Sequence, residues 1–297
     1  MKYYFVINPK SGKKHRDIKG LVEGLAGKYN VSCECAFTER PGHATVLAKN
    51  AVKKGFDRII ACGGDGTIQE TAKGLLSHGR EKAENVEFGL LPCGSGNGLA
   101  RNIRVPLDVE AAAEGLFKWQ ARPVDAGLAN GRLFLVSCGI GLDADVAHCF
   151  NSQSLGRGIL PYIWHSLRLY FTYKPQPVKT VIDGKSQTMR GLVITALIGE
   201  QYGGGAKIAP LALVDDGYLD LCRVRPVSTF RLLLYLPHLF TGSIHKCRSL
   251  YEDIRCREIE FDCGRPFWFH LDGEDFHSDH GNLHVRILPA AFNMIRP

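Results

Sequence analysis

No stretch of the sequence approaches the run of about 18 apolar residues that a membrane-spanning helix needs, so any membrane contact is expected to be peripheral. The first residues carry a single basic side chain and a short apolar run, which does not fit a signal peptide. The 10 cysteines include no CxxC pair and form no short secreted framework. We therefore expect reduced thiols and a cytoplasmic protein.

Acidic residues are outnumbered, with 30 Asp and Glu against 37 Lys and Arg, which leaves a net charge of +7. This charge suits phosphate groups, an anionic membrane surface or nucleic acid. The basic residues are scattered and no RNA-binding motif accompanies them, so no nucleic-acid partner is expected. The histidines near the carboxyl end fit no HExxH or zinc-finger spacing, and no metal site is expected from His270, His277, His280 and His284.

Strands and helices alternate in the first part of the chain, and a length of 297 residues fits two domains. The alternation predicts an open, largely parallel α/β sheet over residues 1–127. The predicted strands lie at 3–7, 31–38, 58–62 and 88–91, and the predicted helices at 14–29, 44–54, 68–76 and 111–117.

From residue 128 the pattern changes to short β-rich runs, and Asp183-Gly184 is a good hairpin dipeptide. This pattern predicts an antiparallel β-sandwich over residues 128–288. The predicted strands lie at 132–138, 178–182, 192–198, 219–224, 258–263, 266–271 and 283–287. Helical segments interrupt them at 159–171 and 229–240.

The segment 226–240 is strongly apolar and is flanked by Arg225, Arg231 and Lys246. Such a helix can touch a membrane surface or gate a lipid site. It can also be an ordinary core helix, and that is the favoured interpretation.

Two glycine-rich turns follow predicted strands, where open α/β sheets bind ligands. The first is Gly63-Gly64-Asp65-Gly66-Thr67, whose glycines let the main chain approach a polyphosphate at the start of a helix. A carboxylate beside phosphates is understandable if Asp65 holds magnesium, directly or through water, or polarises a nucleophile. Alone, the turn has a structural interpretation that is equally good.

The second turn, residues 92–98, strengthens the first because both lie at the same predicted sheet edge. Its Ser95 and Asn97 side chains can bind phosphate or ribose. Neither turn is a Walker A loop or a GxGxxG fingerprint. Together they predict a phosphate cradle.

The motifs Asn8-Pro9-Lys10-Ser11-Gly12, GGDGT and Leu91–Asn97 resemble, in order and spacing, those of the diacylglycerol kinase catalytic domain shared by bacterial soluble lipid kinases and sphingosine kinases. The resemblance continues through residues 212–219 and 271–274. It implies an ATP-binding domain at 1–127, similar to NAD kinases and phosphofructokinases. It also implies a lipid-binding sandwich at 128–288 and a tail at 289–297 that returns towards the first domain.

The resemblance also implies the site residues. The positions that correspond to ATP contacts are Thr38, Gly64, Asp65, Gly66, Thr67 and Ser95, with Gly63 and Asn97 in the same turns and Asn8 and Gly12 in the loop beside the nucleotide. Main-chain carbonyl groups at Leu213, Asp216 and Tyr218 correspond to a structural magnesium site.

Glu274 corresponds to the general base that takes the proton from the lipid hydroxyl, a role that suits a carboxylate. The other interpretation is an exposed hairpin carboxylate, since Asp272-Gly273 is a good turn dipeptide.

The sequence thus predicts a lipid kinase that moves the γ-phosphate of ATP, with Asp65 and Glu274 catalytic, to a lipid hydroxyl at a membrane surface. The Ser95-Gly96-Asn97 version of the turn resembles sphingosine and ceramide kinases, so the acceptor stays open between a diacylglycerol and a sphingoid lipid. The alternatives are an NAD kinase and a catalytically silent lipid-binding regulatory protein. Homodimer formation also stays open.

Overall fold

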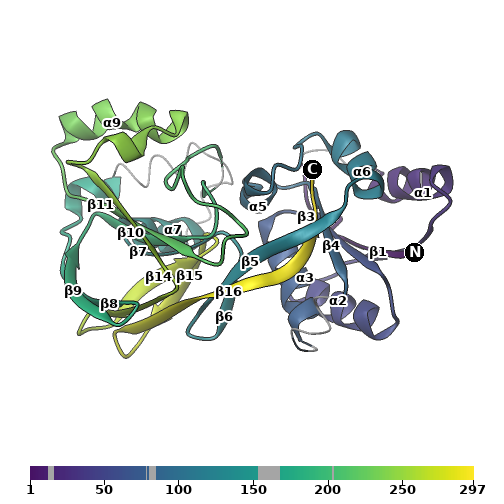
Figure 1. Ribbon diagram of the computed structural model, residues 1–297, viewed down its shortest axis with the longest axis horizontal. Helices are drawn as coiled ribbons and strands as arrows, with labels where there is room; N and C mark the ends of the chain where they lie inside the picture. Colours follow the sequence, from purple (N-terminus) through teal and green to yellow (C-terminus); the bar gives the residue numbers. More distant parts are fainter. Residues whose placement is uncertain (13–16, 78, 80–84, 153–167, 203) are drawn as a thin grey trace. The chain divides into compact units, whose positions relative to one another are not determined.

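The protein is described by a computed structural model that covers residues 1–12, 17–77, 79, 85–152, 168–202 and 204–297. The chain forms two compact units, one of Met1–Asp125 with Ala290–Pro297 and one of Ala126–Pro289 (Figure 1). Strands β5 (Ala121–Ala129) and β16 (Asn282–Ile295) contribute residues to both units.

The first unit is built on a parallel sheet in the strand order β2-β1-β3-β4. Its strands are β1 (Lys2–Ile7), β2 (Ser32–Phe37), β3 (Arg58–Gly63) and β4 (Glu87–Pro92). The end of β16 lies parallel to β4, with Asn293 opposite Glu87. Strand β3 is buried along its whole length, because a central parallel strand is covered on both faces.

Helices cover both faces of this sheet, with α1 and α6 on one side and α2 and α3 on the other (Figure 1). The described helices of the unit are α1 (Ile18–Lys28), α2 (His43–Lys53), α3 (Asp65–Leu76), α5 (Gly98–Asn102) and α6 (Val109–Lys118). Small residues let α2 and α3 approach closely. A Cβ on Gly74 of α3 would lie 2.5 Å from the Thr45 carbonyl oxygen of α2.

The second unit contains an antiparallel sheet in the order β12-β11-β10-β7-β14-β15. Its strands are β7 (Ser137–Gly141), β10 (Val193–Leu197), β11 (Leu219–Val224), β12 (Tyr251–Cys256), β14 (Phe267–Leu271) and β15 (Glu274–Ser278). A second antiparallel layer has the order β16-β13-β8-β9, with β13 (Glu258–Asp262), β8 (Pro177–Ile182) and β9 (Lys185–Arg190). The short β6 (Arg132–Phe134) pairs with β5.

One buried apolar cluster draws on both layers, with Ile140 and Leu221 from the first and Ile259 and Val285 from the second. The predicted fold class, a parallel α/β part followed by an antiparallel β part, is confirmed. The second unit also carries helices α7 (Leu142–Ser152) and α9 (Thr229–Thr241) and the 3-10 turn η1 (Ile244–Lys246). The helical segment predicted at 159–171 lies largely outside the described residues.

Helix α9 is not a core helix, so the favoured interpretation of this segment is wrong. None of its side chains is buried, because only one stripe of the helix packs against the unit and this stripe is itself partly exposed. Among the described residues, no helix is long and apolar enough to cross a membrane.

Candidate active site

Turns that follow the four parallel strands gather the residues predicted for nucleotide binding. Parallel strands that lie side by side end at one edge of the sheet, which is where such sheets bind ligands. The turns begin at Asn8 after β1, Thr38 after β2, Gly64 after β3 and Cys93 after β4. Main-chain hydrogen bonds tie them to neighbouring strands, from Thr38 N to the Ile7 carbonyl (2.8 Å) and from Cys93 N to the Gly63 carbonyl (2.9 Å).

Asn8 braces the turn after β1 against the turn after β3. Its N–H donates to the Cys62 carbonyl at 2.9 Å, and its Nδ2 donates to Thr67 Oγ1 at 3.0 Å. Its Oδ1 accepts the Lys10 N–H at 3.0 Å. Gly12, four residues further on, is exposed and has a φ of +97°. Both the Nδ2 and the Oδ1 atoms of Asn8 therefore stabilise the loop after β1.

The GGDGT turn runs directly into α3, which begins at Asp65. The first N–H groups of a helix have no partner within it and carry partial positive charge. Gly66 is exposed at this point, whereas Gly63 and Thr67 are buried. Gly64 and Gly66 add no side chain at the start of α3, where unpaired N–H groups suit a phosphate oxygen.

The Asp65 carboxylate holds the second glycine-rich turn in place. Its Oδ2 accepts the Asn97 N–H and its Oδ1 accepts the Gly98 N–H, both at 2.9 Å. Burial raises the pKa of the Asp65 carboxyl, and the N–H groups of Gly98 and Asn97 oppose that rise because they favour the charged form. Both oxygens of the Asp65 carboxylate are therefore used to bind main-chain N–H groups of the second turn.

The second turn is closed by Asn97, a buried residue with a φ of +51°. Its Oδ1 accepts the Gly94 N–H and its Nδ2 donates to the Gly94 carbonyl, both at 3.0 Å. The Asn97 side chain is thus occupied within the turn, while Ser95 is exposed. Gly94 lies so close to the first turn that a Cβ there would be 2.6 Å from the Gly64 Cα.

In the second unit, Glu274 is presented on a tightly anchored hairpin between β14 and β15. Leu271 pairs with Glu274 across the two-residue turn Asp272-Gly273, where both residues have positive φ, +52° and +88°. The Asp272 carboxylate accepts three main-chain N–H groups, from Leu135 (2.8 Å), Val136 (2.8 Å) and Ser137 (3.0 Å). The Glu274 side chain is exposed and makes no hydrogen bond or ion pair with any described residue.

Helix α7 also holds this hairpin. Asn151 Nδ2 donates to the Gly273 carbonyl at 3.1 Å and to Asp275 Oδ1 at 2.8 Å. His148 Nδ1 lies 2.8 Å from Asp275 Oδ2, and its ring stacks on Trp268 with ring centroids 3.7 Å apart. Glu274 therefore projects from a hairpin whose neighbouring residues are fixed on both sides.

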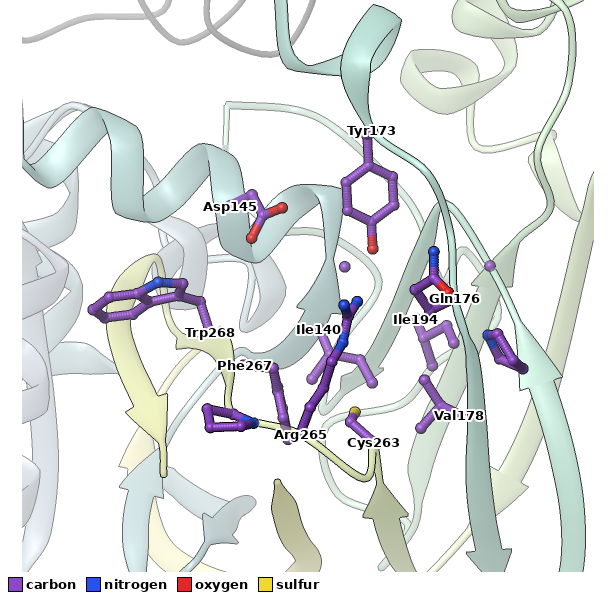
Figure 2. A pocket seen from close by; sticks show the side chains of 14 residues that line it. Ile140, Asp145, Tyr173, Gln176, Val178, Ile194, Cys263, Arg265, Phe267 and Trp268 are labelled. Carbon is purple, nitrogen blue, oxygen red and sulfur yellow. The ribbon is translucent and has the colours of Figure 1, made fainter. Parts of the chain in front are cut away.

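A cavity of about 210 Å³ also lies within the second unit (Figure 2). Apolar side chains line much of it, among them Ile140, Ile194 and Trp268. Figure 2 shows Arg265 reaching into the cavity towards Tyr173 and Asp145. Burial, reinforced by Asp143, raises the pKa of the Asp145 carboxyl. The cavity thus combines apolar walls with a few polar groups, as ligand pockets do.

Two family models match the chain. The diacylglycerol kinase catalytic domain matches residues 2–129, and the YegS C-terminal NAD kinase beta sandwich-like domain matches residues 136–296. The chain belongs to the diacylglycerol kinase superfamily.

Relatives of this superfamily member are named as kinases. The chain is 28% identical over 276 residues to a protein from Bacillus subtilis (strain 168) named "Diacylglycerol kinase", covering 91% of this chain and 88% of the relative. It is 29% identical over 265 residues to a "Probable lipid kinase YegS-like" of Enterobacter sp. (strain 638), covering 88% and 85%. The names of these relatives support the interpretation of this chain as a kinase.

Solved structures show the same fold. A crystal structure of a diacylglycerol kinase from Bacillus anthracis str. Sterne has a TM-score of 0.74 and 22% identity, and covers 100% of this chain and 97% of that one. At this identity the likeness shows the fold alone.

In this chain, the loop predicted to hold magnesium joins β10 to β11. The Asp216 carboxylate accepts the Tyr218 N–H at 3.1 Å and an Arg255 N–H at 2.6 Å. The Tyr218 ring lies under two guanidinium groups, of Arg255 at 4.5 Å and Arg257 at 4.8 Å. Carbonyl oxygens suit magnesium, and Arg255 already pairs with the Asp216 carboxylate. Magnesium binding by the carbonyl groups of Leu213, Asp216 and Tyr218 therefore stays a prediction.

The described histidines belong to no metal-ligand group. In the part of the chain that the structure describes, no group of three or more His, Cys, Asp or Glu side chains could hold a metal ion. Three of the four late histidines contact three different carboxylates, those of Asp143, Asp279 and Glu258.

Sequence reasoning missed the anchoring residues Asp272, Asn151 and His148. The Asp-Gly dipeptide signalled the hairpin turn, but nothing local indicated that its carboxylate would bind N–H groups about 135 residues earlier in the chain. The cap that Asp65 forms on the second turn was missed for the same reason.

Proposed function

We propose that this chain is an ATP-dependent lipid kinase that transfers the γ-phosphate of ATP to the hydroxyl of a membrane lipid, either a diacylglycerol or a sphingoid lipid. The observation that carries the proposal is the pair of glycine-rich turns joined by Asp65, in a chain whose family and relatives are kinases. A cradle of main-chain N–H groups beside a helix start is chemistry for a polyphosphate rather than for a neutral ligand.

In this proposal the nucleotide lies along the edge of the β2-β1-β3-β4 sheet. Phosphate oxygens bind main-chain N–H groups of residues 64–67, and Ser95 and Thr38 supply further donors from neighbouring turns. Asn8 and Asn97 keep these turns in place, as their hydrogen bonds support. Magnesium, bound with ATP, would neutralise phosphate charge during transfer.

We assign Asp65 a positioning part in the reaction, because both of its carboxylate oxygens accept main-chain N–H groups. Asp65 fixes the second turn against the first, so the donors on both turns keep one spacing. The Asp65 carboxylate keeps lone pairs beyond those two hydrogen bonds, and these can accept a water that is bound to the metal of the nucleotide.

We assign Glu274 the general base. An exposed carboxylate without a partner in the described chain is free to accept the proton of an incoming hydroxyl. Its anchored hairpin supports this role, because a base acts efficiently only when its position is fixed.

We propose that the cavity of the second unit takes part of the acceptor lipid. Its volume of about 210 Å³ is below the roughly 300 to 1,000 Å³ typical of pockets for whole drug-sized ligands, so only part of a lipid would fit. The structural magnesium would bind the carbonyl groups of Leu213, Asp216 and Tyr218 and stiffen the loop ahead of β11.

The deciding experiment is transfer of labelled phosphate from ATP to a panel of diacylglycerol, sphingoid base, ceramide and NAD. We expect label in one lipid class and a loss of at least about 100-fold in Glu274→Gln, as for removal of a general base. Glu260→Gln is the matched control, since Glu260 is an exposed carboxylate on β13 of the same unit.

Label in NAD would identify an NAD kinase. No label in any acceptor, with bound lipid recovered, would indicate a silent lipid-binding protein. Either result overturns the proposal.

A further inference from the structure

The outward stripe of α9 is apolar and uncovered. Phe230, Leu233, Leu234 and Pro237 are spaced i, i+3, i+4 and i+7, so they share one side of the helix. Phe230 is 72% exposed, Leu233 and Leu234 are each 57% exposed, and Phe240 one turn later is 50% exposed. Soluble monomers rarely expose such contiguous apolar surface without a partner for it.

The opposite stripe fixes the helix on the second unit. Tyr235 and Leu239 pack against the buried cluster that includes Cys222 and Val224 of β11. The Leu239 carbonyl accepts the Lys207 N–H at 2.8 Å, and Tyr235 Oη lies 3.2 Å from Ser249 Oγ. In Figure 1, α9 lies along the outside of the unit. The exposed stripe therefore belongs to an anchored helix.

The segment around α9 is basic and contains no acidic residue. Residues 221–251 include Arg223, Arg225, Arg231, Lys246 and Arg248, and no Asp or Glu. Arg223 and Arg225 pair with Glu252. Arg231, Lys246 and Arg248 are exposed and form no ion pair with any described residue. Three cations without an ion pair among the described residues therefore lie on α9 and in the segment that follows it.

Apolar side chains together with uncompensated cations match the surface of an anionic bilayer. A second copy of the chain fits less well. A two-fold contact through α9 would bring the cations of one copy towards the same cations of the other, and like charges repel. The 13 residues of α9 extend about 20 Å, too short to span the roughly 30 Å hydrocarbon core but suited to lying in the interface.

We propose that the outer stripe of α9, together with Arg231, Lys246 and Arg248 of the same segment, docks the protein on the surface of an anionic bilayer. This inference rests on the proposed function, since docking would give the kinase access to lipids held in that bilayer.

The test is sedimentation of the full chain with vesicles of phosphatidylcholine containing phosphatidylglycerol, and with phosphatidylcholine alone. We expect binding to the anionic vesicles, weakened at least about tenfold in Leu233→Gln/Leu234→Gln by loss of apolar burial. Arg231→Gln/Lys246→Gln/Arg248→Gln should weaken binding similarly and remove most of its salt dependence. Val46→Gln is the control, because Val46 of α2 is an apolar helix residue with 46% exposure in the other unit.

Unchanged vesicle binding in both α9 variants would overturn the proposal. So would failure of the wild type to bind, or a self-associated wild type that becomes monomeric in Leu233→Gln/Leu234→Gln without vesicle binding. Phosphoryl transfer to detergent-dispersed lipid separates this inference from the proposed function. The α9 variants should keep that activity, whereas an error in the proposed function would leave the wild type inactive there.

Discussion

Asp65 and Asn97 are joined by a hydrogen bond of 2.9 Å from the Asn97 N–H to Asp65 Oδ2, across 32 residues of chain. The bond makes two separate turns into one structure, since the second oxygen of Asp65 accepts the Gly98 N–H. The most informative change at this site is therefore one that keeps the shape of Asp65 and alters its acceptors.

We predict that Asp65→Asn lowers ATP affinity and phosphoryl transfer by about tenfold or more. An amide NH2 would face the N–H of Asn97 or Gly98, and a donor left without its acceptor costs about 1–3 kcal/mol. Thermal shift with and without ATP, alongside the transfer assay, measures both effects. Glu23→Gln, an exposed carboxylate of α1, should leave them unchanged. Wild-type ATP affinity in Asp65→Asn would show that the two turns do not depend on this carboxylate.

We predict that Gly94→Ala disrupts the same site through the backbone. The new Cβ would lie 2.6 Å from the Gly64 Cα, so one turn must move, at a cost of about 1–3 kcal/mol. ATP binding by calorimetry should fall, with a smaller loss of melting temperature. Gly24→Ala, where a Cβ meets nothing within 4 Å, is the control. Equal ATP binding in the two variants would contradict the close approach.

Local patterns in the sequence were sufficient for the first glycine turn, because a buried strand, a glycine cluster and an amphipathic helix follow one another along the chain. The start of α3 at Asp65 rather than near Ile68 was missed, since Gly66 lowers helix propensity there. The short α5 was also missed, because it depends on the distant cap from Asp65. For α9, composition could not show which apolar side chains pack inward.

We predict that Asp272→Ala destabilises the second unit by about 3 kcal/mol and also reduces phosphoryl transfer. Three main-chain N–H groups of residues 135–137 would lose their acceptor, and the hairpin that carries Glu274 would lose its anchor. Urea unfolding and transfer kinetics test the two effects. Asp279→Ala, whose side chain is 82% exposed in the next turn, should change neither by much. Normal phosphoryl transfer in a destabilised Asp272→Ala variant would show that the reaction does not depend on the Asp272 hydrogen bonds.

We predict that Asp220→Asn stabilises the protein at neutral pH. Burial, then the nearby Asp216, raises the pKa of the Asp220 carboxyl to about 6 from 3.8, and its Oδ2 is buried with no hydrogen-bond partner among the described residues. The native state therefore holds this proton more tightly than the unfolded state. Wild-type stability should fall as pH rises from about 4 to about 6, by about 2 kcal/mol.

In Asp220→Asn this fall should be absent, so the free energies of unfolding of the two proteins should converge below pH 4. Chemical denaturation at pH 4, 5, 6 and 7 measures the difference. A constant gap across this range would show that Asp220 does not titrate there.

Strand β16 has a consequence for the order in which the protein is made. Residues Ala290–Pro297 complete the first unit, where Asn293 and Met294 pair with Glu87 and Phe88 of β4. During synthesis, β4 therefore emerges from the ribosome about 200 residues before the end of β16, with which it pairs. The first unit must wait with an open sheet edge at β4 while the whole second unit is translated, and an unpaired edge is where nascent chains aggregate.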